Sequence, residues 1–214
     1  MEAILVKDQK AAAFVMEDGT FEGVYRITEK VCGDVEQVTG VRPKIIKWQG
    51  ALQPAQVYVA TLGNSEMSEA IAEEEGIELS SLCGKRECFL FQVLKNGSLL
   101  IAGSDKRGTI YGLFHISELM GVSPFVHFAD VVPAPQKEII FSEKDSMQSK
   151  EPSVKYRGFF INDEWPAFGN WTFSHYGGFT AEMYDLIFET LLRLKGNYLW
   201  PAMWTSSFSL DGPG

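Results

Sequence analysis

The chain has 214 residues, of which 45% are apolar and 22% are charged, and its formal net charge at pH 7 is −9. These values are typical of a globular protein with one large or two small domains. The negative charge, with no Lys/Arg cluster longer than a pair, argues against nucleic-acid binding, because phosphates need a basic surface. No apolar run approaches the ~18 residues of a membrane span, so no membrane partner is expected.

The first seven residues have neither a basic start nor a long apolar stretch, so no signal peptide is visible. A cytoplasmic location is slightly favoured, and secretion of a longer form stays open. The cysteines Cys32, Cys83 and Cys88 are odd in number and lack a second pair that would complete a zinc site. We therefore expect buried thiols in a reducing compartment and neither a metal nor a cofactor. A homo-oligomer stays open.

The first 150 residues alternate strand-like and helix-like patterns. Strands are predicted at residues 2–7, 11–16, 44–48, 56–62, 89–94 and 98–102, and helices at 21–38, 65–75 and from the 103–108 segment to Met120. Asn96-Gly97 is a strong hairpin signal. The alternation therefore predicts an α/β domain whose sheet is mixed and not purely parallel.

Residues 142–153 are polar and poor in large apolar side chains, and they resemble a linker. A strand at 154–161, a long loop to Gly178, a helix after Thr180 and a strand at 197–204 follow, which is one βαβ unit with parallel strands. One such unit cannot bury both faces of its sheet, so it looks like part of a larger domain. We predict an N-terminal domain at 1–145, a linker at 146–153 and the start of a second domain at 154–214.

Three polar residues, Asn162-Asp163-Glu164, follow the predicted strand at 154–161. In parallel α/β folds, catalytic groups and ligands collect at this edge of the sheet. Asp163 and Glu164 are therefore candidate catalytic carboxylates, as general acid, general base or metal ligand, and Asn162 is a candidate substrate contact. The alternative is that the carboxylates only cap the loop.

Aromatic residues gather at the same edge. Trp200 and Trp204 end the second strand of the unit, and an indole ring can stack on a sugar and donate its N–H to a hydroxyl. Both are candidate substrate contacts, and core packing is the competing explanation. His175, in the aromatic segment before Gly177-Gly178, is the one histidine that we place among the candidates for substrate binding.

A basic pair, Lys106-Arg107, stands at the start of a predicted helix. Free backbone N–H groups and the helix dipole favour an anion there, and a guanidinium binds a carboxylate with two parallel hydrogen bonds. Lys106 and Arg107 are therefore candidate receptors for an acidic substrate. Alternatively, Ser104 or Asp105 caps the helix and both cations are solvated.

Several of these segments together resemble glycoside hydrolase family 115, the xylan α-1,2-glucuronidases. The resemblance rests on Tyr156-Arg157-Gly158-Phe159-Phe160-Ile161-Asn162-Asp163-Glu164, on Gly177-Gly178-Phe179, on the run from Leu191 to Trp204, and on Gly103 to Gly112 and Gly121 to Pro124 upstream. It covers most of the chain from about residue 20 onward.

The resemblance implies an N-terminal α/β domain followed by the first β-α-β unit of a (β/α)8 barrel, in a chain that is an N-terminal fragment. It also implies an inverting enzyme that removes (4-O-methyl)glucuronic acid from glucuronoxylan or its oligosaccharides. Such chemistry uses two carboxyl groups about 6.5–9.5 Å apart, of which one falls in Asp163-Glu164 and the other on a later strand. This part alone is then expected to be inactive. A non-catalytic module that binds acidic sugars or another protein is the alternative.

Overall fold

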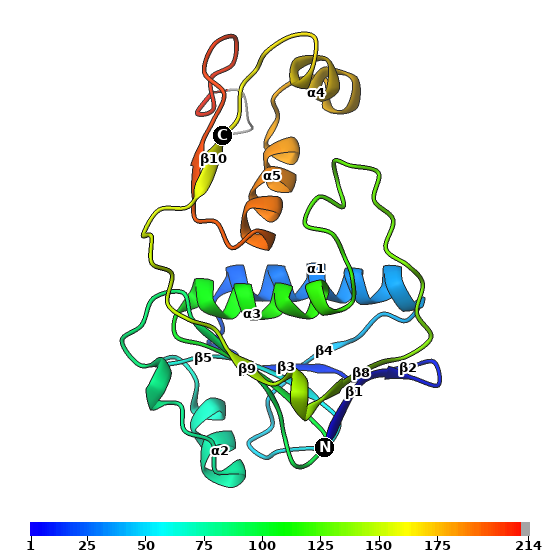
Figure 1. The fold of residues 1–214 in the computed structure, drawn as a ribbon, viewed down its shortest axis with the longest axis vertical. Coiled ribbons are helices and arrows are strands. Elements are labelled where there is room, and N and C mark those ends of the chain that lie inside the picture. Colours follow the sequence, from blue (N-terminus) through cyan, green and yellow to red (C-terminus); the bar gives the residue numbers. More distant parts are fainter. Residues whose placement is uncertain (211–214) are drawn as a thin grey trace. The chain divides into compact units, whose positions relative to one another are not determined.

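The computed structural model describes residues 1–210 and separates the chain into two units (Figure 1). Unit 1 comprises residues 1–126 and 130–153, and unit 2 comprises residues 127–129 together with the chain from Val154 onward. We describe each unit by itself. No helix among the described residues has both the length and the apolar character needed to cross a membrane.

Unit 1 alternates strands with helices, as its sequence predicts. Its elements in chain order are β1 (Glu2–Lys7), β2 (Lys10–Ala11), β3 (Phe14–Met16), α1 (Glu22–Thr39), β4 (Ile45–Lys47), β5 (Val57–Thr61), α2 (Glu66–Glu75), η1 (Ser80–Leu82), β6 (Phe89–Val93), β7 (Leu99–Gly103), α3 (Lys106–Leu119), β8 (Ile139–Ser142), η2 (Glu143–Asp145) and β9 (Met147–Gln148).

The main sheet of unit 1 has the strand order β4-β3-β5-β7-β6-β9. β3, β4, β5 and β7 run parallel, whereas β6 is antiparallel to both β7 and β9. The predicted mixed sheet is confirmed, and so is the hairpin, in which Gly97 has a φ of +80°. The prediction of one strand at 11–16 is wrong, because β2 joins β1 and β8 in a separate sheet while β3 enters the main sheet.

Helices cover both faces of the main sheet (Figure 1), with α1 and α3 on one side and α2 on the other. The side chains of β5 alternate accordingly: Tyr58 and Ala60 pack in one cluster with Met67 of α2, and the Thr61 hydroxyl lies 2.7 Å from that of Thr109 in α3. Strands covered on both faces read as continuous apolar runs, which is why β5 and β7 are almost entirely apolar.

The helix ends follow the signals in the sequence. The Ser65 hydroxyl accepts a hydrogen bond from Ser68 N at the start of α2, and Gly40 and Gly76 end α1 and α2 in the left-handed conformation. At α3 the cap is Asp105, whose carboxylate accepts from Gly108 N at 2.7 Å.

The three cysteines are all free, but they do not share one environment. Cys32 and Cys88 are buried as predicted, and burial raises the pKa of the Cys32 thiol to about 12. The prediction is wrong for Cys83, which is exposed. It directly follows η1, whose Leu82 is the residue that packs into the core, so the Cys83 side chain is left at the surface.

Residues at the end of unit 1 are paired with the sheet. β9 aligns Met147 with Phe91 and Gln148 with Leu90, and the Ser149 hydroxyl accepts from Phe89 N at 2.8 Å. Sequence reasoning missed both β8 and β9. β8 is a short, mostly apolar run of four residues, and β9 has only two residues, both exposed, so neither is long enough for a clear strand pattern. Part of the segment predicted as a linker thus belongs to the edge of the main sheet.

Unit 2 contains β10 (Gly158–Phe160), α4 (Phe168–Tyr176), α5 (Ala181–Arg193) and β11 (Tyr198–Trp200). β10 and β11 are parallel neighbours, which confirms the predicted pairing, although both strands are shorter than predicted. The prediction of a loop up to Gly178 is wrong, because α4 lies within it and ends at Gly177. Aromatic packing of Phe168 and Trp171 stabilises this helix in spite of its glycine and asparagine.

The core of unit 2 lies between α5 and the strand pair. Met183, Tyr184 and Ile187 of α5 are buried with Ala202, and Phe159 and Leu199 pack against them. The same helix carries a buried ion pair, Glu189 with Arg193 at 2.7 Å, and His127 Nε2 lies 2.8 Å from the same Glu189 oxygen. Residues 127–129 thereby belong to unit 2.

Candidate functional site

The candidate site is built on the contact between β10 and β11. At Gly158 a Cβ atom would lie 1.5 Å from the carbonyl oxygen of Tyr198, so only glycine allows the two backbones to approach. Leu199 and Phe159 are opposite each other in the register, as are Trp200 and Phe160. Ile161 N then donates to Trp200 O at 2.9 Å, which continues the pairing to the carboxyl ends of both strands.

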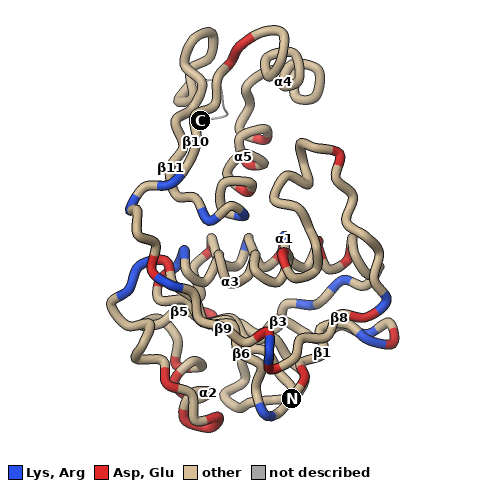
Figure 2. Tube along the Cα trace, viewed as in Figure 1, with Lys and Arg blue, Asp and Glu red and all other residues tan. Residues whose placement is uncertain are grey.

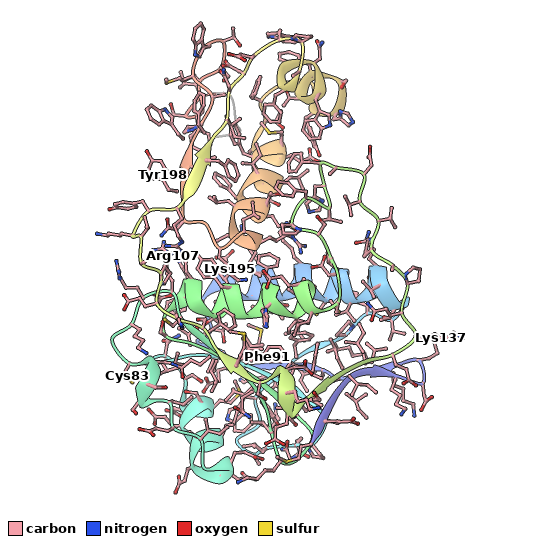
Figure 3. The ribbon with its side chains drawn as sticks, in the orientation of Figure 1. Cys83, Phe91, Arg107, Lys137, Lys195 and Tyr198 are labelled. Carbon is pink, nitrogen blue, oxygen red and sulfur yellow. The ribbon has the colours of Figure 1, made fainter. Side chains whose placement is uncertain are left out.

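The strand pair has two unlike faces. Phe159 and Leu199 point toward α5, whereas Phe160, Tyr198 and Trp200 are exposed. In Figure 3, Tyr198 lies on the side of the strands away from α5. The rings of Phe160 and Trp200 meet edge to face at 5.8 Å. One face of this parallel pair is therefore covered by a helix and the other carries uncovered aromatic rings.

Asp163 joins the carboxyl ends of the two strands. Its carboxylate, in a residue with 2% exposure, accepts hydrogen bonds from the backbone N–H groups of Trp204 (3.2 Å), Thr205 (2.5 Å) and Ser206 (2.9 Å). The hydroxyls of Thr205 and Ser206 also donate to it, at 2.9 and 3.1 Å. A side chain at the end of β10 thus holds the chain that follows β11.

These bonds set the charge of Asp163. Burial acts to raise the pKa of its carboxyl, but the hydrogen bonds from Thr205 and Ser206 outweigh burial and lower the pKa to about 2. Hydrogen bonds to a carboxylate stabilise the ionised form, so Asp163 is charged at neutral pH.

Acid should therefore destabilise unit 2 through Asp163. Because the folded pKa lies below the unfolded value of about 3.9, the stabilisation is present above pH ~4 and is lost as the pH falls toward 2. We expect Asp163→Asn to lower the unfolding midpoint at pH 6, and we expect its difference from the wild type to shrink between pH 4 and 2. Tryptophan fluorescence during urea unfolding measures this, since four of the five tryptophans lie in unit 2. A difference independent of pH would contradict the assignment.

Glu164 differs from its neighbour. Its side chain is exposed, and its carbonyl oxygen accepts from Gly169 N at 3.0 Å, which ties the backbone to the start of α4. The acidic stretch between β10 and α4 in Figure 2 is this pair, Asp163 and Glu164. Of the two carboxylates, Glu164 is the one that solvent or a ligand can reach.

Asn162 precedes the two carboxylates. Its Oδ1 atom is buried and has no hydrogen-bond partner among the described residues. A buried carbonyl oxygen without a partner costs free energy, and a hydroxyl donor from a ligand would satisfy it. Because the atom is buried, a ligand could reach it only if the side chain moved, and the role of Asn162 as a substrate contact stays a prediction.

Aromatic side chains surround the same edge. The exposed fractions of Trp165, Trp200 and Trp204 are 51%, 51% and 78%. The Trp165 ring rests on α4 at Gly169, where a Cβ would lie 2.8 Å from it. Trp200 and Trp204 lie outside the core of unit 2 as described, and their role as substrate contacts stays a prediction. Sequence reasoning did not single out Trp165, which is also exposed.

His175 is placed differently from its prediction. It lies in the last turn of α4 and not in a loop, with its ring stacked on Trp171 at 4.8 Å and its Nδ1 atom 2.8 Å from Trp171 O. His175 is exposed, and its role in substrate binding stays a prediction.

Lys106 and Arg107 lie in unit 1, in the first turn of α3. The Arg107 Nε atom donates to the Glu87 carboxylate at 2.7 Å, and Glu87 is buried. Glu87 N in turn donates to Asp105 Oδ2 at 2.9 Å. Asp105 caps the helix as the alternative explanation states, and Arg107 has an ion-pair partner in its own unit.

Sequence reasoning also missed Thr205 and Ser206, which bind Asp163. The only signal was a run of small hydroxyl residues directly after a strand, which is common in ordinary loops. No group of three or more His, Cys, Asp or Glu side chains within residues 1–210 is arranged to hold a metal ion.

Comparisons with known proteins identify the site's family. The family model described as glycosyl hydrolase family 115 matches residues 149–214. A solved structure described as a family GH115 4-O-methyl-α-glucuronidase, BtGH115A, with specificity for decorated arabinogalactans, is 32% identical to the chain, covers 94% of it and superposes with a TM-score of 0.79. The chain belongs to glycoside hydrolase family 115.

The match extends to only part of that GH115 enzyme, because the chain spans 26% of its length. A second solved structure, described as a GH138 enzyme targeting pectin rhamnogalacturonan II, is 13% identical with a TM-score of 0.52 over 89% of this chain and 24% of its own. At this identity the likeness concerns the fold alone. No curated protein sequence matches the chain.

Proposed function

We propose that the protein is an inverting α-glucuronidase that removes (4-O-methyl)glucuronic acid side chains from a plant polysaccharide, with glucuronoxylan as the first candidate. The observation that carries the proposal is Glu164, an exposed carboxylate just beyond the carboxyl end of β10 and directly before the exposed Trp165. In barrel enzymes, catalytic residues stand at the carboxyl ends of the strands.

We also propose that unit 2 is the first β-α-β part of a (β/α)8 barrel. α5 covers one face of β10 and β11, as the outer helices of a barrel do, and the other face carries Phe160, Tyr198 and Trp200. Parallel strands are ordinarily covered on both faces. In a barrel this face points to the interior, where Tyr198 would pack. Phe160 and Trp200, the last residues of the two strands, would lie at the carboxyl-end rim, where substrates bind.

Inversion needs one carboxylic acid that protonates the leaving oxygen and one carboxylate that activates water on the opposite side of the sugar. Glu164 would supply one of these groups, and in the proposed barrel the second comes from a later strand. Trp200, Trp204 and Trp165 would bind sugar rings through their faces. No cofactor enters this reaction.

The polysaccharide has a second candidate, because the similar GH115 enzyme is described as specific for decorated arabinogalactans. The test incubates the complete protein that contains this chain with 4-O-methylglucuronoxylan, with arabinogalactan and with a neutral arabinoxylan. Release of the uronic acid, followed by NMR, identifies the polymer, and a β-anomer formed first indicates inversion.

The same assay separates the enzyme from a binding module. Binding of a substituted oligosaccharide without release of uronic acid would support a non-catalytic module for acidic sugars. Release from neither acidic polymer, with no binding, would reject the proposed function.

A further inference from the structure

We infer that Asp163 is a positioning residue, which holds the segment of residues 204–206 across the end of β10 and thereby fixes the place of the Trp204 indole. The inference rests on the proposed function and assigns different roles to two neighbouring carboxylates. Asp163 orders the site, and Glu164 is left as the group that meets the substrate.

The hydrogen bonds of Asp163 carry this inference. One oxygen, Oδ2, accepts from the N–H groups and hydroxyls of both Thr205 and Ser206, and Oδ1 accepts from Trp204 N. A carboxylate offers about four lone-pair positions in all. These positions are already taken by protein donors. The residue is also only 2% exposed, so a sugar hydroxyl has little access to its oxygens.

The same donors favour the ionised form of the Asp163 carboxyl. A protonated carboxyl would place an O–H against backbone N–H groups that cannot reverse their role, whereas the ionised form satisfies all of them. A general acid has to carry a proton that it can donate, and the surroundings of Asp163 oppose that proton. The low pKa of this group agrees with the geometry.

The segment that Asp163 holds has little regular structure of its own. Residues 201–206 lie outside any strand or helix, and Trp204 projects from them with 78% exposure. An exposed ring stacks well on a sugar only if its backbone is fixed, because ordering it on binding costs conformational entropy. The bond from Trp204 N to Asp163 connects that backbone to the end of β10.

A double-mutant cycle in the complete protein tests the inference kinetically. Asp163→Asn and Trp204→Ala should each raise KM for a decorated oligosaccharide roughly tenfold, with kcat changed much less. The double variant should resemble either single variant, because both disturb one ring. The pH profile of kcat/KM should keep its shape in Asp163→Asn, and the matched control Glu164→Gln should lower kcat instead.

Two results of the cycle would overturn the inference. One is loss of a limb of the pH profile in Asp163→Asn with KM unchanged, which would make Asp163 the proton-transferring group. The other is multiplication of the two single effects on KM in the double variant, which would separate Asp163 from Trp204.

A second measurement does not depend on turnover. Hydrogen exchange at the amides of residues 204–206 should accelerate at least tenfold in Asp163→Asn, while the amides of α5 keep their protection and Glu164→Gln leaves the segment unchanged. Unchanged exchange at 204–206 would refute the positioning role. If no polymer releases uronic acid, the proposed function fails, and this exchange result still decides the role of Asp163.

If Asp163→Asn does not fold, the milder variant Thr205→Val provides the same test. It removes one hydroxyl donor to Asp163 and keeps the branched shape and the backbone N–H. A smaller acceleration of exchange confined to residues 204–206 supports the inference. Exchange equal to that of the wild type contradicts it.

Discussion

Glu164→Gln should lower kcat for release of uronic acid from a decorated polysaccharide by about 10²- to 10⁴-fold, the usual effect of losing general acid or base catalysis. Glutamine keeps the size of the side chain but cannot exchange a proton. Because Glu164 is exposed and its side chain is outside the Asp163 cluster, the fold should be unaffected. Initial rates with 4-O-methylglucuronoxylan measure the effect, and unchanged tryptophan fluorescence confirms folding.

The same variant distinguishes the two possible roles of Glu164. An aryl glucuronide with an acidic phenol needs no protonation of its leaving group, so it should be cleaved almost normally if Glu164 is the general acid. If Glu164 is the general base, both substrates should be slowed alike, and azide should restore cleavage by taking the place of water. A kcat within threefold of the wild type on every substrate would remove Glu164 from the reaction.

Gly108→Ala should lower the free energy of unfolding of unit 1 by about 3 kcal/mol. At this position in α3 a Cβ atom would lie 2.1 Å from the carbonyl oxygen of Cys88, which is backbone and cannot rotate away. The helix would have to move off β6 and β7, where Gly112 already lies close to Ile101 and Phe89. Urea unfolding followed by far-UV circular dichroism measures the loss.

Gly33→Ala is the matched control, since Gly33 lies in the middle of α1. The nearest atom to its added Cβ is Arg42 Nη1 at 3.5 Å, an ordinary contact with a flexible side chain. Alanine is favoured over glycine within a helix, so this change should raise stability by about 0.5–1 kcal/mol. If both substitutions changed stability equally, the close approach of α3 to the sheet would not depend on the glycine at position 108.

Local signals predict much of unit 1. Apolar residues at steps of three and four predict α1, Asn96-Gly97 predicts the hairpin, and Ser65 and Gly76 mark the ends of α2. Each of these signals is a conformational preference of neighbouring residues, and the tertiary structure agrees with it. β9 has no such signal, because its two residues are exposed and gain order from pairing with β6.

The candidate site was less predictable. Proximity to a strand end singled out Asp163 and Glu164 together, and alternation along the strand could not separate them. Their difference comes from Thr205 and Ser206, more than forty positions along the chain, whose donors reach Asp163 only after β11 pairs with β10. α4 was missed for a related reason, since its stability comes from aromatic packing and not from helix propensity.

The chain enters unit 2 twice, first for the three residues 127–129 and again from Val154. His127 contacts Glu189 of the buried pair, and the Phe128 ring lies 5.2 Å from that of Trp171. An excised piece beginning at Val154 would therefore lose an imidazole from an ionic cluster and a ring from an apolar one. Truncations intended to isolate unit 2 should therefore start upstream of His127, so that residues 127–129 are kept.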